Sequence, residues 1–221
     1  MMLNFDGVTH REELGAIQRY YRIHARIYDL TRWTFLRGRK ALRSQVAKSL
    51  TPLRILEVGC GTGTNLLHLG LLFPQADLWG LDLSTDMLVV ARNKLQKFGS
   101  RLTLVQSAYN HPVSAAQPFD LVVFSYALSM FNPGWELAVT AARQDLSPHG
   151  TIAVVDFYDS PFQAFKKWMG VNHVRLDGHL VPHLVSLFST HTWVMNPVYG
   201  GLWSYFVFLG QNTAPAKPEK T

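Results

Sequence analysis

Cysteine is nearly absent from this sequence. Its 221 residues include one cysteine, Cys60, so no disulfide can form within the chain, and such usage is typical of a reducing compartment. No uncharged apolar run reaches the ~18 residues of a membrane-spanning helix. The first ten residues also lack the basic and then apolar pattern of a signal peptide. We therefore expect a cytoplasmic protein that does not span the membrane.

Metal-ligand spacing is also lacking. His173, His179 and His183 are scattered, which favours separate surface or substrate-facing roles over a zinc site, and we predict no metal. Hydrophobic residues make up 48% of the chain, and its length suits one domain with a sizeable core.

Positive charge is concentrated at the start of the chain. Residues 1–54 hold 11 Lys and Arg against 4 Asp and Glu, whereas the remainder holds 10 against 11, within a net charge of +6. A basic segment on a nearly neutral body favours an anionic surface as partner, either lipid or nucleic acid.

Residues 11–49 have a helical pattern. At 100° per residue, Arg19, Arg22 and Arg26 fall on one side, with isoleucines and aromatic residues on the opposite side. Two interpretations stay open: a helix packed on the body with solvated arginines, or an interfacial helix on anionic lipid. Residues 31–40 interleave aromatic residues with cations and either meet lipid headgroups or cover the active site.

Three closely spaced glycines organise the rest of the chain. An apolar run at residues 55–58 predicts a buried strand, which ends at Gly59, Gly61 and Gly63 before a predicted helix. Such a corner can bind an anion or a nucleotide, because glycine lets a ligand approach the backbone and the helix N-terminus offers free N–H groups. An ordinary tight turn is the alternative.

An acidic residue follows the next predicted strand. Asp82 stands after residues 76–81, where nucleotide-binding folds place an acceptor for ribose hydroxyls. The Gly-x-Gly-x-Gly spacing, with Glu57 two residues before the first glycine, argues against a nicotinamide cofactor, whose motif is Gly-x-Gly-x-x-Gly.

Strands and helices alternate through the centre of the chain, which predicts an α/β fold with a doubly wound parallel sheet. Strands are expected at 53–58, 77–81, 102–106, 119–125 and 151–156, helices at 64–73, 84–97 and 134–145, a turn at 147–150, and two late strands at 191–195 and 203–209.

Two motifs carry a resemblance to a known family. Glu57-Val58-Gly59-Cys60-Gly61-Thr62-Gly63 and Gly80-Leu81-Asp82-Leu83-Ser84 resemble the first and second motifs of class I S-adenosylmethionine-dependent methyltransferases. The resemblance implies a Rossmann-like, mostly parallel seven-stranded sheet with helices on both faces, and S-adenosyl-L-methionine as cofactor. It places a helical lid or membrane-contacting segment at 1–50 and the cofactor-binding domain at 51–211, and the polar, proline-containing residues 212–221 are expected to form a flexible tail.

The resemblance also implies which residues hold the cofactor. The glycines would meet its methionine part, Asp82 the ribose and Met87 the adenine, although Met87 can equally be a core residue. Ser107 stands where the family often has an acid. The full implied set is Glu57, Gly59, Gly61, Gly63, Asp82, Leu83, Met87, Ser107, Ala108 and Ser125.

The N-terminal stretch narrows the resemblance. Residues 20–29 and 31–39 look like the start of bacterial lipid-headgroup N-methyltransferases, above all those of betaine-lipid synthesis. These methylate diacylglycerylhomoserine three times to diacylglyceryl-trimethylhomoserine. The resemblance implies a lipid substrate at an anionic membrane surface, peripheral attachment to the inner face of the membrane, and a partner enzyme that supplies diacylglycerylhomoserine.

Other acceptors stay open. Bacterial phosphatidylethanolamine N-methyltransferases share the Tyr28-Asp29 and Gly38-Arg39 pairs, and a soluble small-molecule or quinone methyltransferase is a further alternative. A non-catalytic cofactor-binding subunit is a third. Residues 125–128 lack the Asn/Asp-Pro-Pro-Tyr/Phe motif of methylases that act on amino groups of DNA bases and proteins, so no nucleic-acid partner is predicted.

The substrate residues follow from this acceptor. Aromatic rings hold a methylated ammonium by cation–π attraction, although they can also form a plain apolar lid. A headgroup carboxylate suits a bidentate arginine. We predict that Tyr28, Tyr126 and Asp156 position the amine, and that Tyr20, Tyr21, Trp33, Arg39 and Arg175 bind the substrate.

Overall fold

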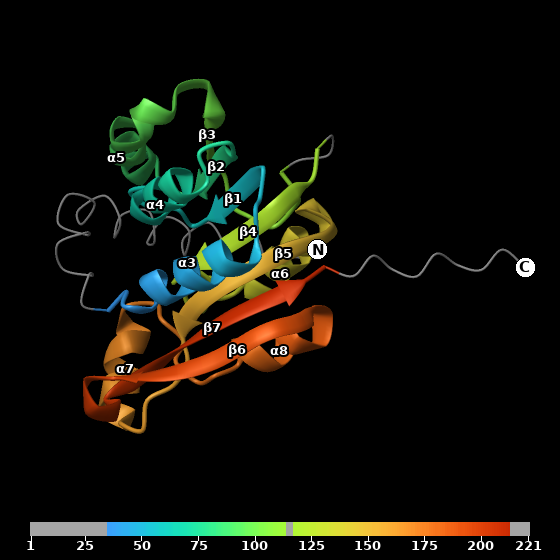
Figure 1. Cartoon of the computed structure of the whole chain (residues 1–221). Helices are drawn as coiled ribbons and strands as arrows, with labels where there is room; N and C mark the ends of the chain where they lie inside the picture. The colour runs from blue at the N-terminus through green and yellow to red at the C-terminus, as the bar shows by residue number, and fades with distance from the viewer. Residues whose placement is uncertain (1–34, 114–116, 213–221) are drawn as a thin grey trace, which may run out of the picture.

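One seven-stranded sheet forms the centre of the computed structural model, which describes residues 35–113 and 117–212, apart from the side chains of Thr190 and His191. The strands are β1 (Arg54–Val58), β2 (Asp77–Asp82), β3 (Leu102–Gln106), β4 (Phe119–Ser125), β5 (Leu146–Phe157), β6 (Ser189–Val198) and β7 (Trp203–Gln211). Their order is β3-β2-β1-β4-β5-β7-β6, and β7 alone among them runs opposite to the others (Figure 1). The predicted Rossmann-like fold is confirmed.

Helices cover both faces of this sheet, which is why β1 and β4 are almost continuously buried. They are α3 (Gly38–Ser49), α4 (Thr64–Leu72), α5 (Thr85–Leu95), α6 (Trp135–Asp145), α7 (Gln163–Val171) and α8 (Leu180–Leu187), with short 3-10 turns η1 (Gln96–Arg101), η2 (Leu128–Met130) and η3 (Tyr199–Gly201). Successive strand residues serve opposite faces: Ile55 packs in the core under α3, α4 and α5, and Leu56 in the core under α6 and α8.

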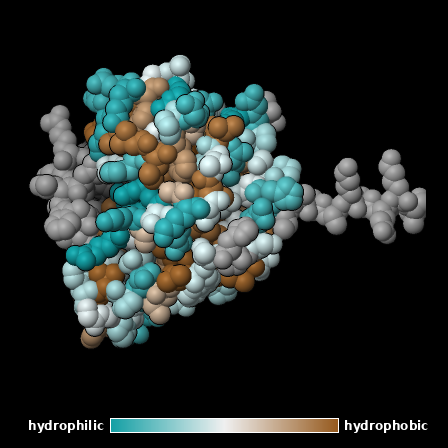
Figure 2. Space-filling model, viewed as in Figure 1, coloured by the Kyte–Doolittle hydropathy of each residue, from teal (hydrophilic) through white to brown (hydrophobic). Residues whose placement is uncertain are grey.

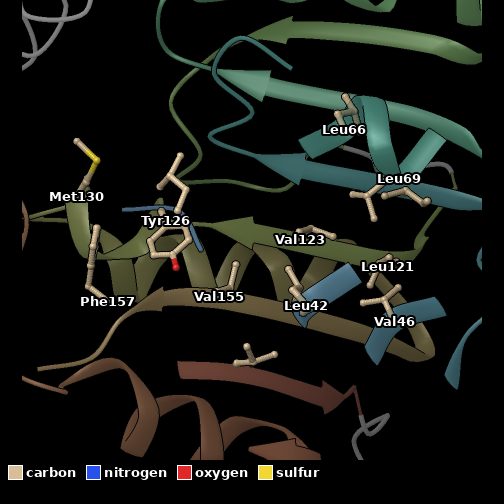
Figure 3. Close-up of a cluster of buried hydrophobic side chains, with 14 of the residues drawn as sticks. Leu42, Val46, Leu66, Leu69, Leu121, Val123, Tyr126, Met130, Val155 and Phe157 are labelled. Atoms are coloured by element: carbon tan, nitrogen blue, oxygen red, sulfur yellow. The ribbon is translucent and has the colours of Figure 1, made fainter. Parts of the chain in front are cut away.

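Helix α3 is fixed on the sheet close to the ends of β4 and β5. Leu42 and Val46 are fully buried and lie over Val123 and Val155 in the core (Figure 3). The helix starts at Gly38, where an added Cβ would lie 2.5 Å from a methyl carbon of Val155. Only glycine allows this close approach, which brings the basic start of α3 to the carboxyl edge of the sheet. The rest of the predicted 11–49 helix lies largely outside the described residues.

Two boundaries differ from the sequence prediction. The predicted turn at 147–150 is part of β5, which begins at Leu146, and the irregularity appears instead as a register shift opposite Phe119 and Leu121 and as φ 71° at His149. The late strand predicted at 191–195 extends to Val198 and includes Pro197. Proline fits there because β6 is the edge strand, where a missing N–H leaves no neighbour unpaired.

The described chain ends in contact with the sheet. The backbone N–H of Asn212 donates to the carbonyl of Gly150 at 2.7 Å, and Asn212 is 7% exposed. Among the helices within 35–212, none has the length and apolarity to cross a bilayer.

Candidate active site

A cavity of about 560 Å³ opens at the carboxyl ends of β1, β2 and β4. The strand order reverses between β1 and β4, and ligands bind at such switch points in parallel sheets. Its size is that of a small-molecule site. The lining residues are Arg39, Gly59, Cys60, Gly61, Thr62, Thr64, Leu81, Asp82, Leu83, Ser107, Ala108, Tyr109, Asn110, Ser125, Tyr126, Ala127, Met130, Phe131, Asn132, Pro133, Gly134 and Leu137.

The three glycines have different roles. Each has positive φ, at 68° for Gly59, 54° for Gly61 and 76° for Gly63. An added Cβ at Gly61 would meet nothing within 4 Å, and Gly61 lines the cavity, so its bare backbone leaves room for a ligand. A Cβ at Gly63 would lie 2.8 Å from Leu95, and Gly63 does not line the cavity. Gly63 therefore allows α4 and α5 to pack together, rather than meeting the cofactor as predicted.

Asp82 lies at the tip of β2 and lines the cavity. One carboxylate oxygen accepts from the N–H of Gly61 at 2.8 Å, and the other accepts from the N–H of Ser84 at 2.9 Å. Burial raises the pKa of Asp82, while these backbone hydrogen bonds act to lower it. The two bonds fix the orientation of the carboxylate, and each oxygen retains capacity to accept from a ligand hydroxyl.

The wall beyond β3 is formed by predicted residues and by one that sequence reasoning missed. Ser107 and Ala108, predicted to bind the cofactor, line the cavity together with Leu83 from the β2 side, and Asn110 adds an unpredicted amide. Met87 is fully buried and is absent from the lining, so the structure places it in the core.

Arg39 reaches the cavity from α3. Its Nε donates to the Oγ of Ser125 at 2.9 Å, which connects the start of α3 to the end of β4. Both side chains line the cavity, while substrate binding by Arg39 and cofactor binding by Ser125 stay predictions. Among residues 35–113 and 117–212, no carboxylate forms an ion pair with Arg39. A cation held through one nitrogen keeps its remaining donors for an anionic group.

Glu57 lies behind the glycine corner, with 1% exposure, and is not in contact with the cavity. One carboxylate oxygen accepts from the side chain of Asn65 at 2.9 Å, and Asn65 in turn accepts from Arg43 at 2.7 Å. The other oxygen is buried without a hydrogen bond within the described chain. Burial raises the pKa of Glu57 to about 7, although Arg39 and Arg43 act to lower it. Glu57 supports the corner from beneath and links it to α3.

Of the predicted amine-positioning residues that the structure describes, one lines the cavity and the other does not. Tyr126 lines the cavity, but its hydroxyl accepts from the N–H of Gly38 at 3.0 Å, so it holds the start of α3. Asp156 is fully buried and outside the lining; it accepts from the N–H groups of Ser129 and Phe157, and burial raises its pKa to about 6. Asp156 thus holds the η2 segment in place behind the cavity.

The remaining predicted substrate residues are not in this site. Arg175 is outside the lining, and its Nε donates to the carboxylate of Asp177 at 2.7 Å on the surface. Tyr20, Tyr21, Tyr28 and Trp33 lie outside the described residues, so the structure does not test their roles.

Sequence reasoning missed the wall that follows β4. Asn132, Pro133 and Leu137 line the cavity, with a cis bond between Asn132 and Pro133 and φ 123° at Gly134. The only local signal is the turn sequence Asn-Pro-Gly after a buried strand. A turn signal predicts a chain reversal, but it does not say which surface the loop will cover.

The sequence matches the methyltransferase domain family over residues 55–150. It is 33% identical over 170 residues to a dTDP-3-amino-3,4,6-trideoxy-alpha-D-glucopyranose N,N-dimethyltransferase of Streptomyces venezuelae, covering 72% of this chain and 67% of that protein. It is 33% identical over 120 residues to a malonyl-[acyl-carrier protein] O-methyltransferase of Geobacter sulfurreducens, covering 54% of this chain but 44% of the relative, so the chain spans less than half of its length.

Solved structures share the fold. The N-methyltransferase NodS of Bradyrhizobium japonicum, in complex with S-adenosyl-L-homocysteine, superposes with a TM-score of 0.66 at 17% identity, covering 80% of this chain and 86% of NodS. At that identity the likeness concerns the architecture alone.

The cavity fits S-adenosyl-L-methionine. A bare backbone at Gly61 faces open space, and the oriented carboxylate of Asp82 beside it can accept from two ribose hydroxyls. Leu83 and Ala108 offer apolar contacts suited to a base. The end near Ser125 and Arg39 then remains for the reacting group and its acceptor.

Proposed function

Because the chain belongs to the class I S-adenosylmethionine-dependent methyltransferases, we propose that it N-methylates the amine of a lipid headgroup that carries a carboxylate. The finer proposal is three successive methylations of diacylglycerylhomoserine to diacylglyceryl-trimethylhomoserine. The observation that carries it is Arg39, a cation held in the cavity by Ser125 that forms no ion pair within residues 35–113 and 117–212.

The cofactor supplies an activated methyl group when bound. In each transfer the neutral amine forms a new bond to the methyl carbon, and the electron pair of the broken carbon–sulfur bond stays on sulfur. The enzyme mainly has to align the two groups, and each ammonium must lose its proton before it can react again. Arg39 would bind the headgroup carboxylate and set the distance of the amine from the methyl group.

The lipid acceptor is supported by sequence and by charge. The basic, aromatic N-terminal stretch resembles lipid-headgroup enzymes, and the first 54 residues hold 11 of the 21 Lys and Arg. The Streptomyces relative is named as an N,N-dimethyltransferase, which supports an amine acceptor methylated more than once.

A second candidate function is O-methylation of a carboxylate on an acyl carrier. The malonyl-[acyl-carrier protein] O-methyltransferases of Geobacter and Magnetococcus, at 33% and 34% identity, favour it. In that reaction the carboxylate oxygen would be the nucleophile, so an Arg39 contact would hold the reacting group itself.

Mass spectrometry of lipids separates these candidates. Cells that make diacylglycerylhomoserine should gain a homoserine lipid heavier by three methyl groups when they express this chain. Asp82→Ala and Arg39→Gln should abolish or reduce the product, whereas Lys40→Gln, at the exposed neighbouring position, should not.

Two other results of this experiment would each indicate a different methyl acceptor. If phosphatidylethanolamine gains the methyl groups instead, the headgroup assignment is wrong and the lipid class stands. If no lipid changes while the purified protein methylates a malonyl thioester, the O-methyltransferase is the correct assignment.

A further inference from the structure

Helix α7 exposes an apolar side. At 100° per residue, Ala164, Trp168 and Val171 fall on one side, opposite the buried Met169. Trp168 is 51% exposed and Val171 81% exposed, and Phe162, directly before the helix, is 54% exposed. A surface helix normally turns its polar side to water, so this arrangement indicates a partner.

The β6–β7 hairpin extends this side. Ser160, before α7, donates to the carbonyl of Leu202 at 2.6 Å, which ties the helix entry to the hairpin. Tyr199 and Leu202 are 49% and 36% exposed. We call the set Phe162, Trp168, Val171, Tyr199 and Leu202 the α7 surface.

Two cations, Arg37 and Lys167, belong to the α7 surface or its edge. The guanidinium of Arg37 lies 5.1 Å over the ring of Tyr199, and Lys167 is exposed on α7 itself. The acidic residue near this surface, Asp159, forms an ion pair with Lys166 at 2.5 Å, so its negative charge is balanced. At the end of the molecule where α7 lies, hydrophobic and hydrophilic patches alternate (Figure 2). Exposed aromatic and aliphatic side chains among cations complement an anionic lipid interface.

The α7 surface is also close to the cavity. Met169 and Val174 belong to the same core as Tyr126 and Met130, which line the cavity. The N–H of Arg175 donates to the carbonyl of Ser129 at 2.9 Å, beside Met130. Helix α7 lies at the edge toward which the β5 arrow points (Figure 1). A bilayer in contact with α7 would therefore lie beside the cavity.

We propose that the α7 surface docks this protein on an anionic bilayer. The inference rests on the proposed lipid acceptor and assigns most of its membrane contact to residues 162–202, far in sequence from the basic N-terminal stretch, of which Arg37 alone takes part. Phe162, Trp168 and Val171 enter the interface, while Arg37 and Lys167 meet anionic headgroups.

Vesicle flotation of the full chain tests this docking. The vesicles contain phosphatidylglycerol and phosphatidylcholine, so no lipid in them has a methylatable amine and binding is read apart from turnover. Val171→Asp should weaken binding about tenfold or more, and Lys167→Glu about 30-fold at low salt. Val89→Asp, at a valine 56% exposed on α5, is the matched control and should bind as the unmodified chain does.

A second measurement locates the contact. In a Trp33→Phe chain, which lacks the tryptophan of the N-terminal stretch, brominated lipid should quench tryptophan fluorescence, and adding Trp168→Phe should remove most of that quenching. Unchanged vesicle binding by both Val171→Asp and Lys167→Glu would overturn the proposal, as would quenching that persists without Trp168.

Other occupants of the surface would give different results. A dimer in sedimentation that Val171→Asp converts to a monomer, without loss of vesicle binding, would assign the surface to a second copy and overturn docking. Failure of docking leaves methylation of detergent-dispersed lipid intact. If the unmodified chain binds the vesicles but does not methylate detergent-dispersed diacylglycerylhomoserine, the proposed acceptor is wrong and the docking surface stands.

Discussion

The two halves of the cavity are built in different ways. The half that fits the cofactor comes from short stretches at the ends of β1, β2 and β3, and the bond from Gly61 to Asp82 at 2.8 Å joins the first two. The half near Ser125 combines the start of α3 with the loop after β4, through the bond from Arg39 to Ser125 across 86 positions. The first half depends on local backbone geometry, and the second depends on how distant elements pack.

Replacing Asp82 tests the cofactor half most severely. Asp82→Ala should weaken S-adenosylmethionine binding about a thousandfold, because two hydrogen bonds to a charged group, at about 2 kcal/mol each, are lost. Isothermal calorimetry measures the affinity directly. Asp77→Ala, at the exposed start of the same strand, is the control and should change it little. Equal affinities for both variants would contradict the assigned ribose site.

Glu57 connects the glycine corner to α3 through Asn65 and Arg43, and its buried carboxyl group should make the stability of the protein depend on pH. Its pKa is raised by burial from 4.5 to about 7, so the folded state binds its proton more tightly than the unfolded chain does. The stability that this group contributes is therefore greatest at low pH, and it falls as pH rises from about 4.5 to about 7.

Glu57→Gln should remove that fall, which we expect to be about 2 kcal/mol between pH 5 and pH 8. Urea denaturation at the two pH values measures the free energy of unfolding. Glu136→Gln, an exposed glutamate on α6, controls for the loss of a negative charge. An unchanged pH dependence in Glu57→Gln would show that Glu57 is ionised without penalty in the folded protein.

A substitution at Gly61, compared with one at Gly200, distinguishes the effect of backbone strain from the effect of blocking the ligand. Gly61→Val places a branched side chain at positive φ and in the open space of the cavity. Cofactor affinity should fall about tenfold or more, since a few displaced contacts cost about 1–2 kcal/mol. Gly200→Val, at φ 67° with nothing near its Cβ, has a comparable strain far from the glycine corner. Both variants should lose stability, but only Gly61→Val should lose affinity in a thermal-shift titration.

The sequence predicts the cofactor half well because its signals are local. The apolar run before Gly59, the glycine spacing and the position of Asp82 at a strand end each follow from short-range rules, and the structure brings these residues together. Glu57 and Gly63 belong to the same motif, but they support the corner from behind, and a one-dimensional pattern does not distinguish contact with a ligand from packing.

The half of the cavity near Ser125 and Arg39 is harder to predict from the sequence because it depends on tertiary packing. The sequence predicts Ser125 and Arg39 as site residues, but not that one holds the other. Nor does any periodicity show that Asp156 turns away from the cavity, or that Pro133 turns toward it. Which side of a strand end faces the ligand depends on α3 and on the loop after β4, both positioned by distant contacts.

Tyr126→Phe should have the smallest effect on stability of these substitutions, and it should affect the acceptor half of the cavity without affecting the cofactor half. The hydroxyl of Tyr126 is the acceptor for the buried N–H of Gly38, so Tyr126→Phe leaves that donor unsatisfied and should cost about 1 kcal/mol of stability. The start of α3 and the attached Arg39 should then be less well held, which should raise KM for the acceptor while cofactor affinity stays unchanged. Tyr158→Phe, on the α8 side of the sheet, is the matched control. If Tyr126→Phe lowers cofactor affinity as much as it raises acceptor KM, the two halves are one cooperative unit, and the division between local and packed construction does not extend to function.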